Sequence, residues 1–217
     1  MVLTPEELRV VGVLMEKEVT TPDYYPMTLN AIVNGCNQKN CRAPLTAYDE
    51  ALVAGALDRL RYEKLLISLV SGAESRVPKY RQRLTEQLVL TLPAHAVMAE
   101  LILRGTQTVG ELRSRAERMC AFSSLDEIQQ VLKTLTDRPD GPLVMLLPRV
   151  AGHKENRWMH LLGGTSESAE NSPAPVASRS LQDQIQRHDI EIAALRAEVE
   201  QLKSFMAEFQ TPHRASS

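Results

Sequence analysis

Apolar residues recur at helical spacing in three segments of residues 1–84, and each segment begins with a threonine, a residue type that can cap a helix. A branched apolar run and an alternating run follow, and together they predict a β-hairpin. The expected elements are helices beginning at Thr4, Thr28 and Thr46, of which the last two end near Asn37 and Lys64, and strands within 65–70 and 76–83.

The same order of elements recurs in residues 85–162, where the hydrophobic pattern predicts three more helices and a second hairpin. The two hairpins begin near Leu65 and Leu143, about 78 residues apart. Three helices followed by a hairpin is the winged-helix order. We therefore expect an α+β, predominantly helical fold with two tandem winged-helix domains, 1–84 and 85–162. The second set of elements covers 93–103, 108–119, 124–137, 142–150 and 156–162.

A change of composition marks the end of these domains. Residues 163–180 are rich in Gly, Ser, Pro and Ala and predict a flexible linker. Residues 181–210 then carry a heptad pattern with branched residues at a and leucine at d, which favours a parallel two-stranded coiled coil and hence a homodimer. A helix that folds back on its own domains is the alternative. The residues expected to dimerise are Leu181, Ile185, His188, Ile192, Leu195, Val199, Leu202 and Met206.

Composition narrows the class of protein. No run approaches the roughly 20 apolar residues of a membrane-spanning helix, and the start of the chain lacks a signal-peptide pattern, so we expect a cytoplasmic protein. Three cysteines are too few for a disulfide framework. The formal net charge of −2 means that any binding to nucleic acid must come from local basic patches.

Two kinds of local patch could contact DNA. The return strand of the first hairpin, 76–83, carries four cations and no acid, and alternate residues of a strand share one face. The loop after the second helix carries amides and cations that could reach bases or phosphates. The candidate DNA contacts are Asn37, Gln38, Lys39, Arg42, Arg76, Lys79, Arg81, Arg83, Arg113, Arg115, Arg149, Lys154 and Arg157.

Each candidate also has a plain structural explanation. The loop residues could simply end a helix, and the cations could be ordinary solvated charges. The acidic pairs Asp49–Glu50 and Asp126–Glu127, which open both third helices, would repel phosphate but would stabilise the helix dipole. No pattern predicts a nucleophile, a metal site or a phosphate loop, so we expect neither catalysis nor a cofactor.

Three stretches, "GVLMEKEVTTPDYYPMTLNAIVNGCNQKNCRAP", "SRVPKYRQR" and "LILRGTQTVGELRSRAERM", together with the closing heptads, carry a resemblance to a known family over nearly the whole chain. On these residues the chain resembles the YceH-like family of bacterial proteins of unknown function. The resemblance implies a pair of winged-helix domains and no known activity.

These patterns support one leading functional hypothesis and one alternative. The leading hypothesis is a homodimeric winged-helix protein that binds double-stranded DNA through its basic wings, as a transcription regulator or an architectural factor. The alternative is an adaptor that uses the same scaffold to bind another protein without binding nucleic acid. The fold alone does not choose between them.

Overall fold

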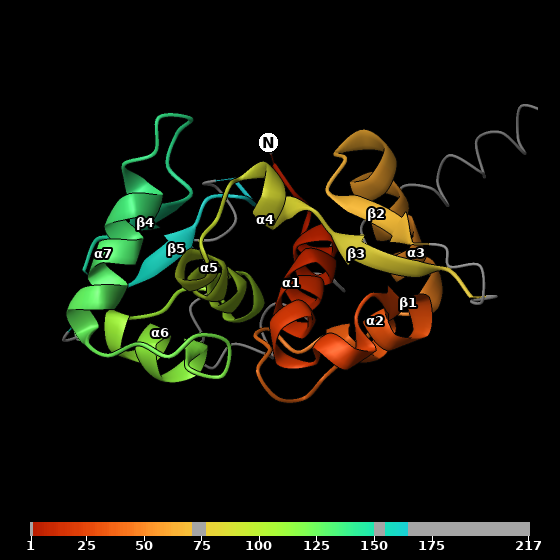
Figure 1. Cartoon of the computed structure of the whole chain (residues 1–217), viewed down its shortest axis with the longest axis horizontal. Helices are drawn as coiled ribbons and strands as arrows, with labels where there is room; N and C mark the ends of the chain where they lie inside the picture. Colours follow the sequence, from red (N-terminus) through yellow and green to blue (C-terminus); the bar gives the residue numbers. More distant parts are fainter. Residues whose placement is uncertain (1, 71–76, 150–154, 165–217) are drawn as a thin grey trace, which may run out of the picture. The chain divides into compact units, whose positions relative to one another are not determined.

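The computed structural model describes residues 2–70, 77–149 and 155–164, all of which belong to one compact unit, Met1–Ser172. The described part is α+β, with helices as its main elements and two small sheets, as expected (Figure 1). The first half contains α1 (Pro5–Thr20), the 3-10 helix η1 (Pro22–Tyr24), β1 (Met27–Thr28), α2 (Leu29–Cys36), α3 (Glu50–Asp58), η2 (Arg59–Glu63), β2 (Ile67–Val70) and β3 (Lys79–Gln82). The second half contains α4 (Leu84–Gln87), α5 (Leu92–Arg104), α6 (Val109–Ala116), α7 (Leu125–Thr136), β4 (Val144–Leu146) and β5 (Trp158–His160).

Side-chain caps fix where most of the helices begin. Thr4 and Glu7 form the capping box expected at the start of α1. Thr28 caps α2, as expected. The expected start of α3 at Thr46 is wrong, because the carboxylate of Asp49 caps that helix by accepting a hydrogen bond of 2.8 Å from the backbone N–H of Leu52. In α5, α6 and α7 the caps are Thr91, Thr108 and Ser124.

The two halves use the same strand topology. In the first sheet β3 lies between β1 and β2, antiparallel to both, and Met27 pairs with Tyr80. In the second half β4 pairs with β5, and a single bridge joins Gln107 to Trp158. Met27 and Gln107 each immediately precede the threonine that caps the next helix. The duplication expected from the sequence therefore extends to this short edge strand.

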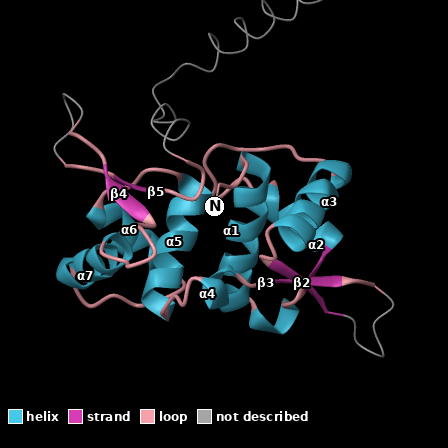
Figure 2. Cartoon of the chain, turned by 90° about the horizontal axis from the view of Figure 1, so that it is seen from above, coloured by secondary structure: helices cyan, strands magenta, loops and turns pink. Residues whose placement is uncertain are grey.

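A single hydrophobic cluster crosses the expected boundary between residues 84 and 85. Helix α1 packs against α5, and Figure 2 shows these two helices side by side, with α2 and α3 beyond α1 and with α6 and α7 beyond α5. Val10, Val13 and Leu14 of α1 join Val97 and Leu101 of α5 in this cluster, and all five are fully buried. The two halves consequently share one core although each has its own set of elements.

The end of the described chain returns to its beginning. The backbone N–H of Leu3 donates a 2.7 Å hydrogen bond to the carbonyl of Leu162. The expected coiled coil at 181–210 and all but the first two residues of the expected linker, 163–180, lie outside the described residues.

Candidate functional site

The strand β3 presents a row of cations on one side of the first hairpin. Lys79 and Arg81 alternate with Tyr80 and Gln82, so the two pairs point to opposite faces. The inward Gln82 is 2% exposed, and its backbone N–H donates a hydrogen bond of 2.8 Å to the hydroxyl of Tyr25. Pairing continues one residue past the strand, because the N–H of Arg83 donates to the carbonyl of Leu66. We call Lys79, Arg81 and Arg83 the basic face.

Two carboxylates partly neutralise the basic face. Arg81 pairs with Glu86 at 2.6 Å and lies 3.9 Å from Glu18, and Arg83 lies 3.6 Å from Glu86. These arginine side chains are 46% and 47% exposed, so water screens the pairs and each contributes little stability. Lys79 makes no ion pair with any residue that the structure describes. Arg76, the fourth expected cation of this hairpin, lies outside the described residues.

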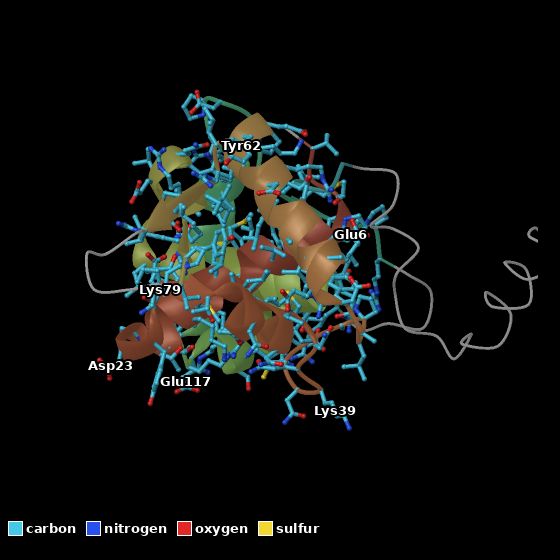
Figure 3. All side chains as sticks on the ribbon, turned by 90° about the vertical axis from the view of Figure 1, so that its right-hand side faces the viewer. Glu6, Asp23, Lys39, Tyr62, Lys79 and Glu117 are labelled. Atoms are coloured by element: carbon cyan, nitrogen blue, oxygen red, sulfur yellow. The ribbon has the colours of Figure 1, made fainter. Side chains whose placement is uncertain are left out.

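The loop after α2 divides the expected DNA contacts into exposed and internal ones. Gln38 and Lys39 are exposed, and Figure 3 shows Lys39 projecting well away from Lys79. Asn37 instead holds the loop together: its amide donates to the carbonyl of Tyr48 at 2.7 Å and accepts from the N–H of Tyr48 at 2.7 Å. Base reading by Asn37 would require breaking both bonds. The structure therefore does not bring Asn37, Lys39 and Lys79 to one surface.

Arg42 is a buried structural residue, which corrects the expectation that it contacts DNA. Its side chain is fully buried, donates to the carbonyl of Gly35, and pairs with Glu16 of α1 at 2.5 Å. A buried carboxylate needs a counter-charge, and Arg42 supplies it. Burial opposes ionisation of Glu16, but the hydrogen bonds and charge of Arg42, followed by those of Arg118, hold the pKa of Glu16 below its ordinary value.

The same charge cluster joins the two halves. Arg118 pairs with Glu16 of the first half and with Glu100 of α5, the latter at 2.5 Å. Arg104 lies 3.0 Å from the second oxygen of Glu100. Glu16 and Glu100 are both buried, so this cluster is a structural connection rather than an exposed binding site.

Most of the expected cations of the second half also serve the fold. Glu111 forms the capping box of α6 with Thr108. It also forms ion pairs with Arg115 and Arg157, both at 3.1 Å. Arg157 also donates to the carbonyl of Thr106 at 2.7 Å. Arg113 makes longer hydrogen bonds, of 3.4 Å, to two carbonyls before α7. Arg149 is exposed, and Lys154 lies outside the described residues.

Two of the acidic residues that open the third helices accept hydrogen bonds at the start of the helix. Asp49 caps α3, and Glu127 accepts hydrogen bonds from the N–H and hydroxyl of Ser123, which lower the pKa of Glu127. These contacts agree with the helix-dipole interpretation of the sequence.

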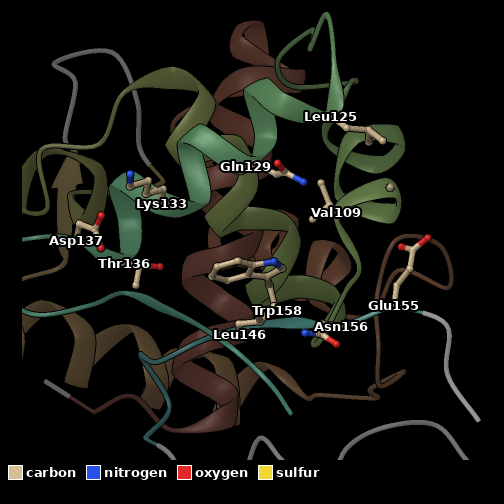
Figure 4. Close-up of a pocket in the computed structure, with 11 residues that line it drawn as sticks. Val109, Leu125, Gln129, Lys133, Thr136, Asp137, Leu146, Glu155, Asn156 and Trp158 are labelled. Atoms are coloured by element: carbon tan, nitrogen blue, oxygen red, sulfur yellow. The ribbon is translucent and has the colours of Figure 1, made fainter. Parts of the chain in front are cut away.

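A groove of about 670 Å³ runs along α7 beside the second hairpin, and the sequence analysis did not find it (Figure 4). Its apolar lining includes Leu125 of α7, Leu146 of β4, Trp158 of β5 and Val109 of α6. Leu125 and Leu146 are 46% and 43% exposed, so both offer apolar surface to the groove. The sequence analysis placed Leu125 in the helix expected at 124–137 and Leu146 in the strand expected at 142–150, and it gave neither residue a surface role. We call this feature the α7 groove.

The described residues hold no group of three or more potential metal ligands among His, Cys, Asp and Glu. Burial raises the pKa of the Cys36 thiol to about 12, so this thiol stays protonated near neutral pH. No described helix is both long and apolar enough to cross a membrane.

The fold and its surfaces define a class: a mainly helical protein with a duplicated helix–strand–helix–helix–hairpin unit, a basic face and an apolar groove. Comparison with known proteins gives the family. Residues 3–153 match the family model described as "Protein of unknown function, DUF480". The chain is 45% identical to a UPF0502 protein of Pelobacter propionicus over 97% of both chains, and 41% identical to one of Enterobacter over 95% of this chain and 98% of that one. This chain therefore belongs to the DUF480 (UPF0502) family of bacterial proteins.

Proposed function

We propose that this chain is a tandem winged-helix protein that binds double-stranded DNA, chiefly through phosphate contacts made by the basic face. The observation that supports it is that Lys79 and Arg81 lie on the side of β3 opposite the buried Gln82, with the exposed Arg83 directly after the strand, at the end of a helix–strand–helix–helix–hairpin unit. In winged-helix proteins that hairpin is the wing, which lies against the DNA backbone.

The neighbouring helix argues for contacts with the backbone rather than with bases. The exposed residues of α3 are Glu50, Ala51, Leu52 and Asp58, and none of them is an Arg, Lys, Asn or Gln, the side chains that make bidentate contacts with bases. Three cations against Glu18 and Glu86 leave the basic face with a small positive excess. We therefore expect modest affinity, strong salt dependence and little preference between sequences.

Binding to a labelled duplex at about 50 and 200 mM salt tests the proposal. Replacing Lys79 and Arg83 with Ala should weaken binding to all sequences and reduce the slope of log K against log salt by about 0.9 for each lost contact. Glu86→Gln should strengthen binding, because it removes the carboxylate that Arg81 and Arg83 share. Lys133→Ala, a cation on α7, is the matched control and should leave the slope unchanged.

Wild-type protein that shows no salt-dependent binding near 50 mM salt would contradict the proposal and favour the adaptor alternative. Equal slopes for the wild type and the double variant would show that DNA, if bound, lies elsewhere on the protein.

We further propose that the protein is a homodimer joined by a parallel coiled coil over residues 181–210. This proposal rests on the heptad pattern alone, since that segment lies outside the described residues.

A further inference from the structure

The α7 groove is a candidate interaction surface on the second half, independent of the basic face. Its sides are α7 and the second hairpin, and Figure 4 shows Trp158, Val109 and Gln129 around a common space. Exposed leucines that converge with an indole on one concave surface are typical of an interaction site, whereas single exposed leucines are ordinary.

The length of the groove favours a chain-like occupant. Its lining residues along α7 run from Leu125 to Asp137, the residue directly after the helix, a distance of about 18 Å at the rise of an α-helix. That length matches about three turns of a partner helix. The volume also lies within the range of small-molecule sites, so a small ligand is the main competing occupant.

The charges on the lining indicate the chemistry of the partner. Asp137 and Glu155 contribute two negative charges and Lys133 one positive charge, so the lining side chains have a net charge of −1. Neither carboxylate forms an ion pair with another residue in the part of the chain that the structure describes. An apolar floor with an acidic excess repels nucleic acid and complements a partner that carries both apolar and basic side chains.

Two amides complete the lining. Gln129 on α7 and Asn156 on the hairpin each offer donors and an acceptor, and both residues are exposed. They can satisfy polar groups at the edge of an apolar contact.

We propose that the α7 groove binds an amphipathic, basic helical segment of another protein, whose apolar side chains pack on Trp158, Leu125 and Leu146. The mode is a helix laid into a hydrophobic groove, with basic side chains of the partner facing Asp137 and Glu155. This inference does not depend on DNA binding by the basic face.

Trp158 makes the test direct, because it is the only tryptophan of the chain and its fluorescence reports on the groove. The probes are three synthetic peptides of about four helical turns. The first carries leucine and lysine at helical spacing. The second has glutamate in place of each lysine, and the third has serine in place of each leucine. We expect the leucine–lysine peptide to shift the emission and to bind at least about tenfold more tightly than the other two.

Matched variants locate the contact. Leu146→Asp should weaken binding of the leucine–lysine peptide by about tenfold, whereas Leu52→Asp, at a comparably exposed leucine of α3, should change it less than about twofold. Asp137→Asn combined with Glu155→Gln should reduce the preference for lysine over glutamate.

Four results would overturn the proposal. The first is equal binding of all three peptides, and the second is equal loss in Leu146→Asp and Leu52→Asp. The third is an emission that changes with protein concentration alone, which would assign the groove to a second copy of this chain. A shift caused by small aromatic molecules but by none of the peptides would assign it to a small ligand, and would also contradict the proposal.

Discussion

Gly12 of α1 lies so close to Ile102 of α5 that a Cβ atom added to Gly12 would be 2.8 Å from the Cγ2 atom of Ile102. The same Cβ would be 2.9 Å from the Cδ2 atom of Leu103. Both distances are shorter than real side chains allow, and both neighbours are buried. The absence of a side chain at Gly12 thus lets the two central helices approach, and through them the two halves share one core.

Gly12→Ala should destabilise the protein. Overpacking a tight core costs about 1 to 3 kcal/mol, which exceeds the gain of about 1 kcal/mol from better helix propensity, because two buried side chains must move. Gly55→Ala in α3 is the control: the nearest atom there is 3.5 Å away on the side chain of Arg59, so only the propensity gain remains. Urea unfolding measures both, and a Gly12→Ala protein as stable as Gly55→Ala would contradict the close contact.

The charge cluster between the halves should be more important for stability than the ion pairs of the basic face. Glu16→Gln leaves the buried Arg42 without its counter-charge, and we expect a loss of about 3 kcal/mol. Glu86→Gln breaks exposed pairs and should cost less than about 1 kcal/mol. If thermal unfolding shows a larger loss for Glu86→Gln than for Glu16→Gln, the buried ion pair between Glu16 and Arg42 does not contribute the stability expected of it.

His160 should make the protein less stable in acid. Burial lowers the pKa of His160 to about 4, and its Nδ1 atom has no hydrogen-bond partner among the residues that the structure describes. The unfolded chain binds a proton near pH 6.5, so between pH 6.5 and 4 the unfolded state takes up more protons than the folded state. This effect removes up to about 3 kcal/mol of stability as the pH falls through that window, and none of it is lost above pH 7.5 or so.

Unfolding of His160→Leu as a function of pH checks this assignment. The variant should lose less stability than the wild type on acidification. Any pH dependence of the free energy of unfolding that remains in the variant comes from other groups. One of these is His95, whose pKa is also lowered by burial and which bonds to the carbonyl of Met15. Identical acid profiles for the wild type and His160→Leu would rule out His160 as the source.

Deleting residues 180–217 should convert the proposed dimer into a monomer without unfolding the rest. The described core ends at Leu162, and the closing heptads supply the only apolar seam expected beyond it. Light scattering of the full-length and truncated chains measures the subunit number, and circular dichroism confirms that the truncated chain stays folded. An unchanged subunit number would remove the coiled coil as the dimer contact.

Local signals in the sequence were enough to locate most of the secondary structure. Each of the caps at Thr4, Thr28, Thr108 and Ser124 is a hydrogen bond between residues three apart, so the capping residue can be found from the local sequence. The start of α3 was misplaced because Thr46 and Asp49 are both good caps. Tertiary contacts decided between them: Asn37 holds Thr46 and Tyr48 in the loop, which leaves the cap position to Asp49.

The functional surfaces differ in how far the sequence alone predicts them. Alternation along β3 by itself determined that Lys79 and Arg81 share a face, because a strand has a period of two. Only the tertiary structure decided that Arg42, a loop residue, is internal, since its burial depends on a carboxylate 26 residues away on helix α1. The α7 groove likewise exists only where α7 meets the second hairpin, and no segment of the chain carries a pattern for a space between two elements.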